Sequence, residues 1–248
     1  MDRHDLRWTM TELGFLGFPQ AHRDEIELKM NADPDKFNIA GKKEFQGMKG
    51  KESIDYTIYF KKYDKVNAYH PYMYQATLPD IGRSQNFRIV QDAGFSLPDA
   101  FNLLHGRSVH KLVIDHQERK LRPYWFQLDL SGKDVHGNHP ITKHQLDPQE
   151  LSIGRELETR GVKEMLNPTK RVNLVLSLYY GNAEPVTIRN GDKDHQVFAA
   201  VFPKERSVKL LNSDGKELTV EAQRAMERKH LEPIAEQLTR SKRRGRGI

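Results

Sequence analysis

Alternating apolar and polar residues dominate the first half of the chain, a pattern typical of half-buried β-strands. The clearest run is Ile54 to Tyr63, which is rich in β-branched and aromatic residues. Tyr69 to Leu78 returns antiparallel to it, and Phe87 to Val90 adds a third strand. Before them, apolar residues between Lys36 and Phe45 indicate a short strand pair that turns near Gly41. These runs predict antiparallel pairing through short turns.

Apolar residues at helical spacing predict two short helices at the start, Trp8 to Phe18 and Gln20 to Asn31. A third helix is expected after Ser96, whose hydroxyl is placed to cap it, and it ends at Gly106. The helices therefore flank the strand-rich segment on both sides in the sequence.

The second half of the chain repeats these element types. Val109 to Asp115 and Tyr124 to Leu130 predict a hairpin, with a short strand to follow at Ile141. A helix is expected from Asp147 to Leu166. The run Arg171 to Tyr180 is compatible with strand or helix, and the Gly-Asn pair that follows it favours a helix.

Strands then return before a final helix, and the Asn190-Gly191 pair signals a hairpin turn between two of them. This order favours an α+β fold, with antiparallel hairpins and a meander packed against helices. The shared helix-then-hairpin order suggests two similar subdomains. The strands are expected at 185–189, 195–202 and 207–211, the helix at 219–239, and the segments are 1–92, 93–218 and a C-terminal helix and tail at 219–248.

The absence of cysteine among the 248 residues excludes disulfides, thiolate metal ligands and thiol nucleophiles. The segment from Met1 to Gly17 carries charges among its apolar positions, unlike a signal peptide. No apolar run is long enough to cross a bilayer. We therefore expect a soluble, cytoplasmic protein without a membrane partner.

The basic charge is concentrated at the C-terminus. The net charge is +6 and the pI about 9.3, and the sequence RSKRRGR at 240–246 supplies most of the excess. Basic clusters of this kind release counterions from phosphates, and the alternative is a solvated tail that keeps the protein soluble. The candidate contacts are Arg240, Lys242, Arg243, Arg244 and Arg246.

The predicted hairpin at 54–78 combines aromatic and basic side chains. Strand alternation places Tyr59, Lys61 and Tyr63 on the face opposite the core, and Lys62 lies beside them in sequence. Proteins bind single-stranded nucleic acid by stacking bases on rings while lysines meet the phosphates. Ordinary cross-strand packing is the alternative explanation. We take these four residues as candidate nucleic-acid contacts.

The Gly106-Arg107-Ser108 sequence after the third helix offers a second set of phosphate contacts. Arg107 and Lys111 are the candidate side chains. The backbone there belongs to a helix C-terminus, whose dipole disfavours an anion. A packing and turn role is the alternative.

Histidines and carboxylates form two further groups that could support metal chemistry. His136, His139 and His144, next to Asp134, are weak metal candidates in a polar loop. A metal-dependent nuclease is suggested by a second group: His105, His110, His116, Asp115 and Asp129, with Glu118 and Lys120 in the intervening turn. Because no phosphate-binding glycine loop or nucleophile elbow is present, we assign no catalytic residue, no metal and no cofactor.

Several sequence blocks resemble a known family. They read QNFRIV, SLPDAFNLLHGRSVHK, YWFQLDL and KDVHGNHPITKH between Gln85 and His144, followed by SLYYGNAEPVTI. The GRSVHK and GN-x3-VT pieces are the most specific. Over Tyr56 to Gly215 the chain resembles an uncharacterised domain family carried on bacterial conjugative and mobilisable elements. The departures are a compact length and a short basic tail, where relatives carry long polar extensions.

The resemblance implies a setting rather than an activity, because that family has no established function. Its companions on such elements include topoisomerases, primases and relaxases, which implies a role near DNA. The leading hypothesis is thus a non-enzymatic accessory protein that binds DNA or RNA. The alternatives are a protein-interaction module, docking through exposed strands or the helix at 219–239, and a metal-dependent nuclease.

Overall fold

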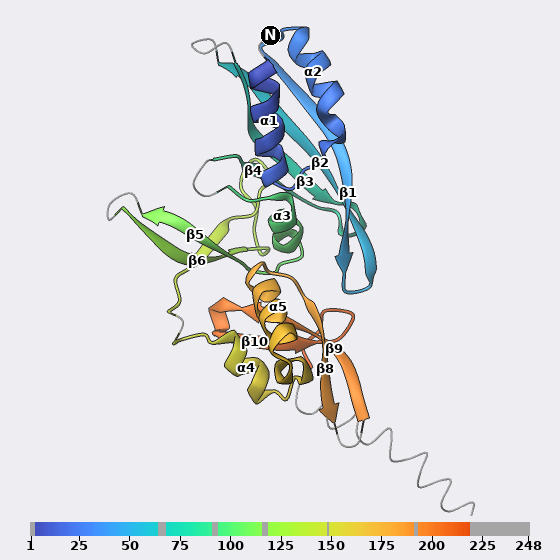
Figure 1. Cartoon of the computed structure of the whole chain (residues 1–248), viewed down its shortest axis with the longest axis vertical. Helices are drawn as coiled ribbons and strands as arrows, with labels where there is room; N and C mark the ends of the chain where they lie inside the picture. The colour runs from blue at the N-terminus through green and yellow to red at the C-terminus, as the bar shows by residue number, and fades with distance from the viewer. Residues whose placement is uncertain are drawn as a thin grey trace, which may run out of the picture.

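The computed structural model describes residues 3–63, 68–90, 94–115, 119–147, 149–190 and 193–218. The helix expected at 219–239 and the basic tail lie outside the described residues, as do His116, Glu118 and Gly191. The described chain folds into three antiparallel sheets with helices packed against them, which confirms the α+β class (Figure 1). No described helix has the length and apolar character needed to cross a membrane.

The first sheet is a four-stranded antiparallel meander in the order β1-β2-β3-β4. β2 and β3 are the two strands that alternation predicted most clearly, and β4 begins earlier than the predicted Phe87. The strands are β1 (Lys36–Gly47), β2 (Gly50–Tyr63), β3 (Ala68–Leu78) and β4 (Arg83–Arg88). A bulge between Tyr59 and Phe60 shifts the register of β2 against β3.

The predicted turn at Gly41 is wrong, because Gly41 lies in the middle of the continuous strand β1. The glycine is required by a close contact rather than by a turn. A Cβ atom at this position would lie 2.5 Å from the Tyr56 hydroxyl and 2.6 Å from Nε2 of His22. These two groups hydrogen bond to each other at 2.6 Å over the strand. The turn of the hairpin instead lies between Gly47 and Gly50.

Helices cover one face of this sheet, which we call the inner face. The two predicted N-terminal helices are present, and Figure 1 shows both lying along the sheet. Phe18, in the loop between them, packs edge-on against Tyr56 and Tyr74. The elements are α1 (Arg3–Phe15), η1 (Gln20–His22), α2 (Arg23–Asn31), η2 (Pro79–Ile81) and α3 (Leu97–Leu104). Burial of the apolar faces of α1, α2 and α3 against the inner face builds the first core, to which η1 and η2 contribute no buried residue.

The predicted cap of α3 is confirmed. The Ser96 hydroxyl accepts a hydrogen bond from the Asp99 backbone, and the Asp99 carboxylate accepts one from the Ser96 backbone. Leu97, Phe101 and Leu104 of this helix are buried in the first core. The helix α3, which opens the predicted segment 93–218, therefore packs with the segment 1–92.

The second sheet joins the two halves of the molecule. It contains β5 (Val109–Asp115), β6 (Lys120–Leu128) and β7 (Ile141–His144) in that order. Val109 and Leu128 belong to the first core, whereas Trp125 belongs to a second core formed by the C-terminal half. The β5–β6 hairpin extends away from the body of the protein (Figure 1).

The third sheet has the order β10-β9-β8, and it confirms the predicted C-terminal meander. Arg171 to Tyr180 is helical, as the following glycine favoured. The single helix expected from Asp147 to Leu166 is wrong, because Gly161, with φ of 68°, ends a shorter helix. The elements are α4 (Ile153–Thr159), η3 (Lys163–Leu166), α5 (Pro168–Tyr179), β8 (Glu184–Asn190), β9 (Lys193–Phe202), η4 (Pro203–Glu205) and β10 (Ser207–Leu211).

One turn design occurs in both halves. Between β3 and β4, Pro79 starts a three-residue helical turn that ends at the left-handed residue Gly82. Between β9 and β10, Pro203 starts the same turn, and Arg206 is the left-handed residue, with φ of 51°. In both places proline supplies the fixed φ of the first helical position.

Candidate nucleic-acid interface

The outer face of the first sheet, which the helices leave open, brings together basic and aromatic side chains from all four strands. Strand register places Lys36, Lys61 and His70 side by side. The next row across the sheet contains Asn38, Tyr59, Met73 and Arg88. Because cross-strand neighbours share a face, these side chains form one surface, which we call the basic-aromatic face.

Aromatic rings on this face are accessible. Tyr63 is 46% exposed, and its ring meets that of His70 edge-on at 5.4 Å. The ammonium of Lys61 lies 5.9 Å from the centre of the Tyr63 ring. Tyr59 is partly exposed and stacks on no other ring of the described residues. A planar ligand can therefore reach at least two rings.

Within the part of the chain that the structure describes, the basic charges of this face lack acidic partners. Lys36 lies directly opposite Lys61, a like-charge pair that destabilises a sheet unless an anion offsets it. No carboxylate of the described residues lies within ion-pair distance of Lys36, Lys61 or Arg88. Farther along the sheet the lysines are paired, since Lys42 contacts Asp55 at 3.3 Å. The unpaired charges are thus gathered around Tyr59 and Tyr63.

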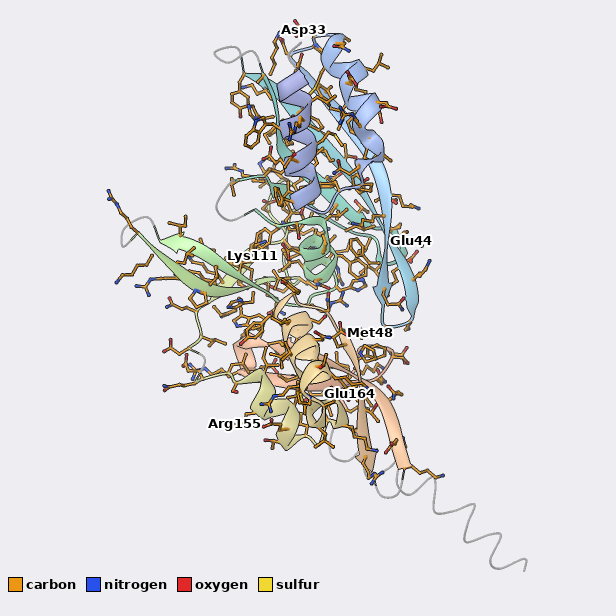
Figure 2. The ribbon with its side chains drawn as sticks, in the orientation of Figure 1. Asp33, Glu44, Met48, Lys111, Arg155 and Glu164 are labelled. Carbon is orange, nitrogen blue, oxygen red and sulfur yellow. The ribbon has the colours of Figure 1, made fainter. Side chains whose placement is uncertain are left out.

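Lys62 does not belong to the interface, which corrects the sequence prediction. It pairs with the buried Tyr69 across the sheet and so faces the inner side. Its ammonium reaches Oδ1 of Asp33 at 2.5 Å, and the Tyr69 hydroxyl donates to the same oxygen. These two donors lower the pKa of Asp33. Figure 2 shows Asp33 at the end of the sheet, beyond α2.

Arg107 is also structural rather than exposed to a ligand. Its Nε and Nη2 both donate to Oδ1 of Asn102, at 3.0 and 2.7 Å, and its guanidinium lies over the Phe101 ring. Burial lowers the pKa of Arg107 to about 10. A guanidinium held this way contributes to packing and is not free for phosphate.

Lys111 has a similar structural role. Its ammonium donates to Oδ2 of Asp99 at 2.7 Å, so it ties β5 to the capping box of α3. Figure 2 shows Lys111 where the β5–β6 hairpin meets α3. The packing alternative, left open by the sequence for both Arg107 and Lys111, is therefore the one that the contacts support.

The two most specific pieces of the family resemblance meet in space. Asn102 donates to the Tyr180 carbonyl and to Oδ1 of Asn182. Gly181, with φ of 84°, packs so closely that a Cβ atom would lie 2.5 Å from the Ser108 carbonyl oxygen. These motifs thus form the junction between the two halves.

The metal candidates do not converge. Among the described residues no three His, Asp or Glu side chains are grouped to hold a metal ion. Nδ1 of His139 is 2.8 Å from the Gly132 carbonyl, and the backbone of His136 bonds to Asp134. His144 is paired in β7 with Trp125. The loop instead covers the edge of β4, where Gln85 bonds to both the carbonyl and the amide of His139.

The paired carboxylates expected of a nuclease lie at opposite ends of their hairpin. Asp115 pairs with Lys120 at the outer end, whereas Asp129 follows Leu128 beyond the end where Val109 pairs with Phe126. Six residues of strand separate these ends, about 20 Å. One metal centre cannot bridge that distance, so this arrangement gives the nuclease hypothesis no support.

The remaining histidine candidates take part in packing. Nε2 of His105 lies 2.9 Å from Oε2 of Glu52, which links α3 to β2. His110 packs edge-on against Trp125 and Tyr179, and its burial lowers its pKa. Neither residue lies on the basic-aromatic face.

Three residues of the interface were not predicted from the sequence: Lys36, His70 and Arg88. Each lies on a different strand, and only the register shows that they flank Tyr59, Lys61 and Tyr63. The alternation of Lys36, Asn38 and Ala40 against buried Ile39 was the available signal. Comparison with protein-family models, curated proteins and solved structures finds no match to this chain.

Proposed function

We propose that the protein is a non-enzymatic factor that binds single-stranded nucleic acid on its basic-aromatic face. The observation that carries this proposal is the grouping of Lys36, Lys61 and Arg88 around Tyr59 and Tyr63. These three cations have no acidic partner among the residues that the structure describes. Phosphates would offset the like charges, and bases would stack on the rings. Each contribution needs the other, because lysines alone bind any anion and rings alone bind any apolar group.

The architecture favours single strands over duplex. RNA-recognition domains also use a four-stranded antiparallel sheet with helices on one face and aromatic residues on the other. That likeness is one of arrangement only. A flat, accessible sheet suits unpaired bases, whose faces are free to stack, while a duplex hides them.

The setting follows from the resemblance and the composition. The resemblance to a family carried on conjugative and mobilisable elements supports a role near DNA, as an accessory factor of such an element. The chain contains no cysteine, in keeping with a cytoplasmic location. Its C-terminal basic residues would add phosphate contacts of low sequence specificity. DNA and RNA both fit the chemistry described.

Neighbouring lysines on opposite faces provide the test. Fluorescence anisotropy of labelled single-stranded and duplex DNA and RNA would be measured with the full chain. Lys61→Gln should weaken binding, whereas Lys62→Gln should leave it unchanged, because Lys62 faces Asp33. Tyr59→Ala and Tyr63→Ala should each weaken single-strand binding by about 5- to 150-fold, and Tyr→Phe should not.

Controls separate this face from general electrostatics. Tyr180, 65% exposed on the other half, provides a matched tyrosine, and Tyr180→Ala should bind normally. Equal losses in Lys61→Gln and Lys62→Gln would contradict the proposal, as would no binding to any of the four nucleic acids at low salt. In the latter case the protein-interaction hypothesis would take precedence.

A further inference from the structure

A cavity of about 740 Å³ lies beside the basic-aromatic face, between α1 and β3. It forms where β3 has a free edge, because β4 pairs only with Met73 to Leu78 and leaves the first part of β3 uncovered. Pockets of this size accept drug-sized ligands, so a nucleoside fits.

The cavity presents an aromatic surface. Trp8, in the middle of α1, lines it and is 67% exposed, and Phe15 at the C-terminal end of α1 is 85% exposed. Neither ring stacks on another ring of the described residues. An exposed indole ring such as that of Trp8 is the kind of surface on which an unstacked base packs.

Its polar groups include one carboxylate. Glu12 lines the cavity in a partly buried position and forms no ion pair with a described lysine or arginine. Burial raises the pKa of Glu12, and the charge of His70 opposes that shift. A carboxylate in this position gains from N–H donors supplied by a ligand. None of the described residues that line the cavity is a lysine or arginine, so we expect the phosphates of such a ligand to stay outside it.

His70 connects the cavity to the basic-aromatic face. It lines the cavity, and its ring also meets Tyr63 at 5.4 Å on the outer face. The ammonium of Lys61 lies over the same Tyr63 ring, 5.9 Å from its centre. A single-stranded nucleic acid bound on the sheet can therefore keep its phosphates at the lysines while one of its bases turns over the edge of β3 into the cavity.

We propose that this cavity binds one unstacked guanine base of the single strand held on the basic-aromatic face. Guanine presents N1–H and the exocyclic amino group side by side, and these two donors match the two oxygens of the Glu12 carboxylate. The other bases place at most one such donor there, beside an acceptor that the carboxylate repels. Trp8 supplies the stacking surface. This assignment rests on the proposed function.

Intrinsic fluorescence provides the test. The chain has two tryptophans, and Trp125 is buried, so Trp8 is the one that reports on this cavity. The probes are a short oligouridine and the same oligouridine with one guanosine added, either at the 5′ end or at the 3′ end. The guanosine strand should bind about 5- to 150-fold more tightly and change the emission of Trp8. Glu12→Gln should abolish this preference, and Trp8→Phe should abolish the signal.

The controls distinguish the cavity from the face. Glu27→Gln on the exposed side of α2 should keep the preference for guanosine. Equal affinity for both strands, with Lys61→Gln still weakening binding, would overturn the cavity assignment and leave the proposed function standing. No binding of either strand would overturn both. Thermal unfolding of each variant confirms that the fold is intact.

Discussion

The side-chain nitrogen of Asn102 donates a hydrogen bond to Oδ1 of Asn182, at 2.9 Å, and another to the carbonyl of Tyr180, at 2.8 Å. Its oxygen accepts two hydrogen bonds from Arg107. Asn102 is only 1% exposed, so one buried amide satisfies groups from both halves of the chain.

Asn102→Ala should therefore destabilise the protein by about 2–4 kcal/mol, because it leaves the Tyr180 carbonyl and the Arg107 guanidinium without this partner. Urea unfolding followed by circular dichroism would measure the loss. Asn31→Ala, at the exposed end of α2, is the control and should change stability little. A loss no larger than that of the control would show that water replaces these bonds.

Gly41→Ala should destabilise the protein by about 1–3 kcal/mol, because the added methyl group overlaps the Tyr56 hydroxyl and His22. Removing that hydroxyl in the Gly41→Ala, Tyr56→Phe double variant should recover part of the loss. Gly132→Ala is the control, since no atom lies within 4 Å of its added Cβ. Thermal unfolding of the four proteins completes the comparison.

Stability should fall as the solution becomes acidic, in part through His110. Burial lowers the pKa of His110 below its usual 6.5. Below pH 6.5 the unfolded chain therefore binds a proton at His110 that the folded chain does not. The contribution of His110 to the free energy of unfolding is thus fully present above pH 6.5 and is lost as the pH falls through the lowered pKa of the folded state. The slope from this residue stays under about 1.4 kcal/mol per pH unit.

Unfolding at pH 7.5 and 5.5 would measure that effect. His110→Phe keeps a ring between Trp125 and Tyr179 and should reduce the difference in stability between the two pH values. His136→Gln, exposed in its loop, should leave the difference unchanged. An unchanged difference in His110→Phe would assign the acid sensitivity to other groups.

Shortening the chain tests the tail. A chain ending at Thr239 lacks Arg240, Lys242, Arg243, Arg244 and Arg246. At about 0.7 per lost phosphate contact, the slope of log affinity against log salt should become shallower by up to about 3.5. A chain ending at Leu218 should match it unless the segment 219–239 adds contacts of its own. Unchanged slopes would place all binding on the folded part.

Short-range sequence patterns predicted the helices and strands well, and the tertiary contacts between them less well. Ser96 and Asp99 lie three residues apart, so the capping box is readable from the chain alone. The glycine at position 41 gave a false turn signal, because its cause is a contact with Tyr56, fifteen positions along the chain. Strand alternation correctly separated Tyr59, Lys61 and Tyr63 from the core.

The interface could be predicted only in part for the same reason. Strand alternation places Lys62 and Lys61 on opposite faces, but the prediction grouped them because they are neighbours in the sequence. The ion pair with Asp33 shows that Lys62 is held on the inner side. Arg107 looks like a surface cation until Asn102 and Phe101 enclose it. Lys36, His70 and Arg88 join the face through register, which the sequence of a single strand does not contain.

The hairpin β5–β6 supplies Val109 to one core and Trp125 to the other, although the two residues lie on adjacent strands. Cutting the chain on either side of this hairpin removes part of the core of one half and exposes its apolar side chains to water. Neither half is therefore a unit that recombination can move alone. A gene fragment that carries one half to a new context must carry residues 109–128 with it.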